Sequence, residues 1–155
     1  MKGLKVASMS TIKAKNGIVI GVPNISLPKG TEIFVFGSNE SGIHGAGAAR
    51  YAMDKLGAVK GIGFGFTGTT FAIPTKDFHI ETLSMEEVKR YVKAFIFWAK
   101  CHDEWNFKVT RIGCGLAGFK DEEIAPLFKD CGDNCSFDTF WKEWLGENKK
   151  YWGTF

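Results

Sequence analysis

The chain has 155 residues, of which 45% are hydrophobic and 24% charged, with a net charge of +3. These values are ordinary for one globular domain. The mild positive charge comes from scattered lysines, so it does not argue for a nucleic-acid partner. No apolar run has the length of a signal peptide or a membrane span, so no membrane partner is expected.

The four cysteines do not predict a metal centre. Cys131 and Cys135 are spaced as Cys-x-x-x-Cys, without a second pair or a spaced histidine that would complete a zinc site. We expect reduced thiols, a cytoplasmic location and no cofactor.

Short apolar runs predict strands in the first part of the chain. Residues 1–16 show no clear period, and residues 17–21 and 25–27 are short enough to be strand pieces. Residues 33–36 form a continuous apolar run, typical of a strand buried on both faces of a mainly parallel sheet.

A helix and a second buried strand are expected next. Small residues in 45–56 favour a helix packed close to the sheet, with Gly57 as its C-terminal stop. The alternating glycines of 61–68 indicate either a close approach to a ligand or another backbone, or a flexible loop. Residues 70–74 read as a strand that ends at a proline.

The second half predicts one long helix and several short elements. Ser84 and Glu87 form a capping box before a helix over 85–101, whose apolar residues recur at helical spacing. The other expected elements are a strand at 107–112, a helix at 121–128 capped by Asp121, a strand at 135–137 and a helix at 140–145. Strands that alternate with helices indicate an α/β domain, with ligands outside the C-terminal strand ends.

Two glycine-rich turns are the most informative feature of the chain. Residues 36–49 and 111–119 each follow a predicted strand and lead into a predicted helix. Backbone amides that glycine leaves accessible at a helix N-terminus bind phosphate. Two such turns on one sheet could hold both phosphates of a nucleotide diphosphate.

Three strand ends define the expected cleft. Asn39 either closes an Asx turn or bonds the ligand, and His44 is expected to be more exposed than core and to contact phosphate or ribose. Cys114 is expected to be a small buried residue rather than a nucleophile. The full set of candidate site residues is Ser38, Asn39, His44, Gly45, Ala46, Gly47, Thr75, Lys76, Asp77, Gly113, Cys114, Gly115, Leu116, Ala117 and Gly118.

Three ordered blocks resemble the macro domain, the ADP-ribose-binding fold, and within it the terminal ADP-ribose glycohydrolase branch. They are His-Gly-Ala-Gly-Ala-Ala at 44–49, Phe-Ala-Ile-Pro-Thr-Lys at 71–76 and Arg-Ile-Gly-Cys-Gly-Leu at 111–116. With Phe-Gly-Ser-Asn at 36–39, Ile-Pro-Thr-Lys-Asp at 73–77 and Ile-Gly-Cys-Gly-Leu-Ala-Gly at 112–118, the chain resembles more closely still a family of short proteins of bacteriophages and bacteria. The resemblance covers roughly residues 31–128 and implies a macro-like three-layer α/β/α domain with a mixed, mainly parallel sheet.

The resemblance also implies roles for residues at the strand ends. In the glycohydrolase branch, the lysine at the Lys76 position attacks or contacts the distal ribose, and an aspartate follows Gly-Cys-Gly-Leu. In this chain Ala117 occupies the position of that aspartate. Asp77 and His44 are the candidates to take over its acid–base role. Macro domains commonly hold adenine with an aspartate near the first strand, whereas residues 1–28 contain none.

The resulting hypothesis is that the protein binds ADP-ribose or an NAD-derived signal molecule. A phage protein of this kind would sequester the signal in the host cytoplasm and so act against host defence. The alternative is an ADP-ribosyl hydrolase that uses Lys76 and Asp77. A third hypothesis is an interaction or architectural domain whose glycines serve packing alone. The aromatic residues of the C-terminal stretch are expected to pack in the core, or to form a homo-oligomer interface if they are exposed.

Overall fold

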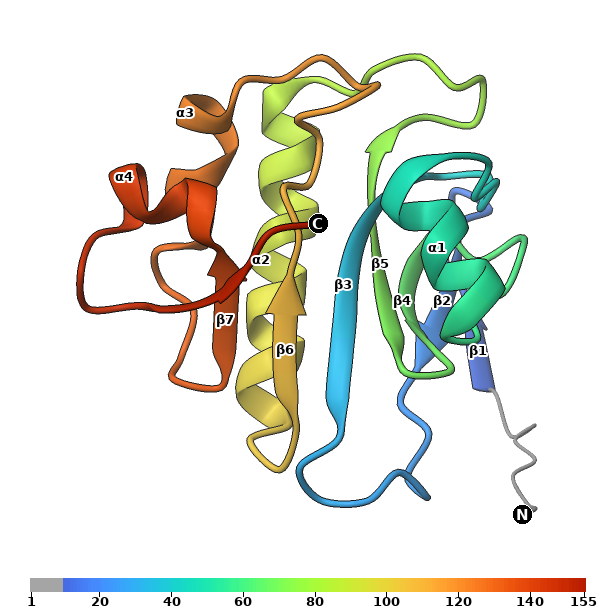
Figure 1. Ribbon diagram of the computed structural model, residues 1–155. Coiled ribbons are helices and arrows are strands. Elements are labelled where there is room, and N and C mark those ends of the chain that lie inside the picture. The colour runs from blue at the N-terminus through green and yellow to red at the C-terminus, as the bar shows by residue number, and fades with distance from the viewer. Residues whose placement is uncertain (1–9) are drawn as a thin grey trace.

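The computed structural model describes residues 10–155, which form one eight-stranded sheet with helices on both faces (Figure 1). The strand order is β1-β2-β4-β5-β3-β6-β7-β8, and only the β1–β2 and β4–β5 neighbours are antiparallel. The strands are β1 (Ser10–Lys13), β2 (Val19–Val22), β3 (Glu32–Asn39), β4 (Phe64–Thr67), β5 (Thr70–Lys76), β6 (Asn106–Val109), β7 (Cys135–Asp138) and β8 (Lys150–Gly153). The helices are α1 (Gly47–Lys55), α2 (Met85–Cys101), α3 (Asp121–Ile124) and α4 (Lys142–Leu145), with 3-10 helices η2 (Ala125–Phe128) and η3 (Thr139–Trp141).

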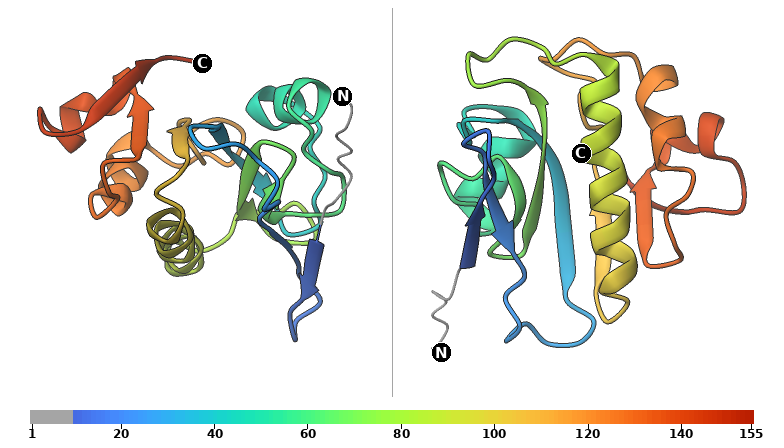
Figure 2. Two further views of the ribbon diagram at one scale, coloured as in Figure 1. Left: turned by 90° about the horizontal axis from the view of Figure 1, so that it is seen from below. Right: turned by 180° about the vertical axis from the view of Figure 1, so that it is seen from behind.

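The three layers follow from the alternation of side chains along the central strands. On β3, Ile33 and Val35 belong to the large core cluster under α2, whereas Phe34 and Phe36 belong to a smaller cluster under α1. Figure 2 shows α1 on one side of the sheet and α2 on the other. The predicted three-layer α/β/α architecture with a mainly parallel sheet is therefore confirmed.

Local signals in the sequence located most of the helices. The capping box of Ser84 and Glu87 is present, and α2 spans the expected residues. The other expected helices are also present, and Gly57, with φ of +86°, ends α1 as predicted. Helix formation depends on contacts close in sequence, which is why these predictions were accurate.

Several strand predictions were wrong. Residues 25–27 form no strand, while β1 and β8 were not predicted. All four residues of β1 are exposed and β8 is only partly buried, so neither has the apolar run that marks an interior strand. The expected strand at 107–112 ends earlier, at Val109.

The alternating glycines of 61–68 permit close backbone approach rather than forming a flexible loop. A Cβ at Gly63 would lie 2.0 Å from the carbonyl oxygen of Asn39, and one at Gly65 would lie 2.2 Å from that of Gly21. A side chain at either position would overlap with backbone, so glycine is needed to bring β4 against its neighbours.

Candidate functional site

Three neighbouring strands bring the predicted site residues to one edge of the sheet. β5, β3 and β6 are adjacent, and the segments that follow them lie together at the top of Figure 1. Thr75 Oγ1 donates to the carbonyl oxygen of Ser38 (3.3 Å), and Thr82 Oγ1 donates to that of Ala117 (3.0 Å). We call the segments 40–46, 77–83 and 110–120 the rim loops.

The N-terminus of α1 presents unpaired backbone amides at this edge. Ala46 is the N-cap, no side chain among residues 10–155 caps the helix, and no acidic residue lies in its first turn. A Cβ built at Gly45 or Gly47 meets no atom of the described residues within 4 Å, so the space beside these glycines is open. An uncapped helix end of this kind favours an anion.

His44 is buried, and its expected exposure was wrong. Its exposed fraction is 1%, and its Nε2 lies 3.0 Å from the carbonyl oxygen of Val59. A carbonyl only accepts, so Nε2 bears the proton and Nδ1 accepts from the hydroxyl of Ser38 (2.7 Å). Burial lowers the pKa of His44, which therefore stays neutral and anchors the loop with both ring nitrogens occupied.

Asn39 closes the loop that follows β3. Its side-chain oxygen accepts from the backbone amide of Ile43 (2.9 Å) and from the hydroxyl of Ser41 (2.8 Å), and its amide donates to the Ile43 carbonyl (2.8 Å). Of the two predicted roles, the structure displays the turn-closing one. Thr75, also buried, has a packing role beside Gly113.

The second glycine turn combines one packed glycine with two open ones. Gly113 has φ of +79°, and a Cβ there would lie 3.2 Å from Phe119 and 3.3 Å from Thr75. At Gly115 and Gly118, a Cβ would have no atom of residues 10–155 within 4 Å. Leu116 between them is 79% exposed. The outer half of this turn therefore leaves room for a ligand, while its inner half is part of the core.

Cys114 is half-buried and is not activated. Burial, followed by the nearby carboxylate of Asp121, raises the pKa of its thiol to about 12. A thiol in this environment stays protonated at neutral pH, as expected for a packing residue rather than a nucleophile.

Asp121 anchors the second turn instead of capping a helix, contrary to the sequence-based prediction. Arg111 donates to its carboxylate through two nitrogens (2.8 and 2.7 Å), and the indole nitrogen of Trp141 donates to it as well (2.7 Å). The guanidinium of Arg111 lowers the pKa of Asp121. Lys120 is the N-cap of α3.

Lys76 and Asp77 lie at the end of β5 in different situations. Lys76 is half-buried, and among residues 10–155 no carboxylate lies within 4.0 Å of its ammonium. Asp77 accepts from the backbone amides of His79 (2.8 Å) and Glu81 (3.0 Å). The Glu81 amide lowers the pKa of Asp77, so Asp77 is a carboxylate that closes its own loop.

Sequence reasoning missed a carboxylate at the same edge. Glu40 directly follows β3, and its backbone amide bonds the carbonyl of Lys76 (2.9 Å). Its carboxylate accepts from the hydroxyl of Tyr91 on α2. Their sequence separation of 51 explains why no sequence pattern revealed the pair.

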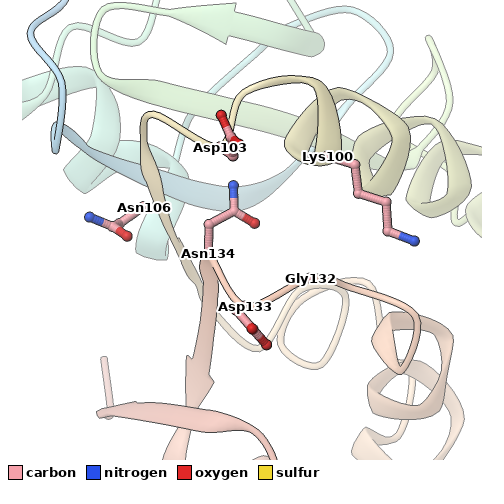
Figure 3. A pocket seen from close by; sticks show the side chains of 6 residues that line it. All are labelled: Lys100, Asp103, Asn106, Gly132, Asp133 and Asn134. Atoms are coloured by element: carbon pink, nitrogen blue, oxygen red, sulfur yellow. The ribbon is translucent and has the colours of Figure 1, made fainter.

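A polar hollow of about 360 Å³ lies at the opposite end of the sheet, below the N-terminal ends of β6 and β7. Figure 3 shows Lys100 pointing away from Asp103 and Asp133, so the charged groups that line the hollow do not converge on one point. Asn134 donates to the carbonyls at the end of α2 and serves the fold. Across residues 10–155, no group of three His, Cys, Asp or Glu residues could hold a metal ion, and no helix is long and apolar enough to cross a membrane.

Comparison with known proteins leaves the site unassigned. No protein-family model matches the chain, and no curated protein matches it. The fold is similar to a solved protein of unknown function from Bacteroides thetaiotaomicron, with a TM-score of 0.49 and 18% identity over 68% of this chain and 83% of that chain. A likeness at this level adds nothing to the assignment of a function.

Proposed function

We propose that the chain is a macro-like protein that binds an ADP-ribose-type nucleotide at the rim loops. The observation that best supports this proposal is the pairing of two open, glycine-lined segments on neighbouring strands. One is the uncapped N-terminus of α1, and the other is the outer half of the second turn at Gly115 and Gly118. The Gly118 amide already donates to the Gly115 carbonyl (3.0 Å), so in the second turn it is the amide of Gly115 that is suited to a phosphate, as the first amides of α1 are in the other segment.

Lys76 supplies a positive charge for the same ligand. It lies at the end of β5, next to the open segments, and no described carboxylate neutralises it. An ammonium group in this position can bond ribose hydroxyls or a phosphate oxygen.

Binding without turnover is favoured over hydrolysis, because the obvious acid–base groups are absent or occupied. Ala117 has no ionisable group, Asp77 is bonded to its own loop, and both ring nitrogens of His44 are engaged. The retained lysine at position 76 is the observation that favours the glycohydrolase alternative. In the binding case the protein would act by holding an NAD-derived signal, in the cytoplasm or, for a phage protein, in the host cytoplasm.

The decisive experiment is calorimetric titration of the full chain with ADP-ribose, NAD and cyclic ADP-ribose isomers, followed by chromatography of each mixture. We expect binding with the nucleotide recovered intact. Conversion of the nucleotide would establish the hydrolase alternative, and absence of heat with every compound would refute the proposal.

Lys76→Ala separates the two cases further, with Lys89→Ala on the exposed surface of α2 as the matched control. In a binding protein, Lys76→Ala weakens affinity by roughly 10- to 150-fold, the effect of losing one charge-assisted hydrogen bond. In a hydrolase it abolishes turnover while substrate still binds. Equal affinities of Lys76→Ala and Lys89→Ala for ADP-ribose would show that Lys76 does not contact the ligand.

A further inference from the structure

A second cavity, a groove of about 420 Å³, lies beside α1 and involves none of the rim-loop residues. Its volume falls within the range of small-molecule sites. The residues that matter for its chemistry are Glu32, Phe34, Tyr51, Lys108, Trp152 and Phe155.

The groove exists because α1 covers only part of its face of the sheet. On β6, Phe107 and Val109 enter the core under α2, which leaves Lys108 on the opposite face, toward α1. The C-terminal end of the chain lies in front of β6 in Figure 1, and on the same side as α1 in the left view of Figure 2. The groove is the space between α1 and this terminal segment.

Its walls are aromatic and held in place. The indole nitrogen of Trp152 donates to the carbonyl of Val109 (2.9 Å), which fixes the plane of the ring. Tyr51 and Phe155 pack with their ring centroids 5.3 Å apart, yet remain 41% and 58% exposed. Fixed aromatic rings with accessible surface favour a planar aromatic ligand, because nucleobases stack on such rings.

A carboxylate and an ammonium group lie together among these walls. Lys108 Nζ is 3.9 Å from Glu32 Oε1 and 4.5 Å from the ring centroid of Trp152. The Glu32 side chain is 65% exposed, so this ion pair is weak and its members can exchange partners at little cost. Together the pair offers two acceptor oxygens next to one donor nitrogen.

We propose that this groove is a binding site for a guanine nucleoside or nucleotide. The base-pairing edge of guanine presents two adjacent N–H donors followed by a carbonyl acceptor, which is complementary to the Glu32 carboxylate and the Lys108 ammonium. Adenine has only one of those donor positions, and uracil lacks the amino group. This site is separate from the rim loops and goes beyond the function proposed for them.

The test is titration of the full chain with GMP, in which tryptophan fluorescence monitors binding. AMP and UMP serve as competitors. We expect saturable quenching, and GMP binding at least tenfold tighter than AMP or UMP. Glu32→Gln should abolish the preference for GMP over AMP, because the amide presents one acceptor oxygen in place of two. Tyr51→Leu and Trp152→Leu, measured by calorimetry, should each weaken GMP binding by about tenfold, the effect of losing a stacking ring.

Phe97→Leu is the matched control, since Phe97 is a 66% exposed aromatic residue on α2, on the other side of the sheet. It should bind GMP as the wild type does, and so should Gly115→Val at the rim loops. Absence of saturation at millimolar GMP, equal affinity for GMP and AMP, or a GMP preference that survives Glu32→Gln would each overturn the proposal. Loss of GMP binding in Gly115→Val would also overturn it, because the two sites would then not be separate.

Discussion

Gly115 offers the sharpest test of the phosphate site, because a substitution there should affect binding without affecting folding. Within the described part of the chain, a Cβ at Gly115 meets no atom within 4 Å, and the Gly115 backbone does not have a positive φ. Gly115→Val should therefore change the free energy of unfolding by no more than about 0.5 kcal/mol, as for ordinary surface substitutions. The branched side chain would, however, occupy the space proposed for a phosphate.

The expected loss of affinity follows from the hydrogen bonds that valine would prevent. A hydrogen bond from a backbone amide to a charged group contributes about 1.5–3 kcal/mol. Losing one such bond weakens ADP-ribose binding by roughly 10- to 150-fold, and losing two weakens it further.

Gly113→Val is the matched control in the same turn. Gly113 has φ of +79°, and its Cβ would crowd Phe119 and Thr75. A left-handed backbone costs about 1–2 kcal/mol for a residue with a side chain, and the crowding adds to it, so Gly113→Val should unfold at lower temperature. Calorimetry with ADP-ribose and thermal unfolding measure both quantities. Wild-type affinity in a folded Gly115→Val protein would refute the phosphate site.

Three further predictions concern the environment of single residues. Burial holds the pKa of His44 below 6.5, so the unfolded chain takes up the proton first as the pH falls. The free energy of unfolding, measured with urea, should therefore decline from about pH 7 to about pH 5. A constant value over this range would contradict a buried neutral ring. An alkylating reagent near neutral pH should label exposed Cys101 well before Cys114, because the pKa of the Cys114 thiol is raised to about 12. Mass spectrometry measures the order of labelling, and labelling of Cys114 first would contradict the prediction. Ser84→Ala should lower the free energy of unfolding by about 1 kcal/mol through loss of the α2 cap, and an unchanged urea midpoint would show that the capping box adds nothing.

The sequence alone was sufficient for features that depend on neighbouring residues. Ser84, Glu87 and the helical spacing of apolar residues defined α2, and the continuous apolar run of 33–36 defined the centre of β3. The placement of glycine turns after strands also predicted which segments meet at one edge of the sheet, because parallel strands end on the same side.

Only the tertiary structure decided which polar side chains are available for a ligand. His44 and Asp77 are both polar residues in turns, but one is buried against Val59 and the other bonds its own loop. Likewise, nothing local marks Asp121 as the partner of Arg111 and Trp141, or Glu40 as the partner of Tyr91. These pairings are made between segments far apart along the chain.

The division between the two sources of information has one physical cause. Helix caps, glycine turns and buried strands depend on backbone conformation and on the hydrophobicity of nearby residues, which the sequence displays directly. The aromatic groove depends on Phe34, Lys108 and Trp152 arriving on one face from β3, β6 and β8, and the state of each polar group depends on what packs against it. Burial and partners are properties of the assembled layers, so the sequence determined the framework and the edge of the proposed site, while the folded structure decided its chemistry.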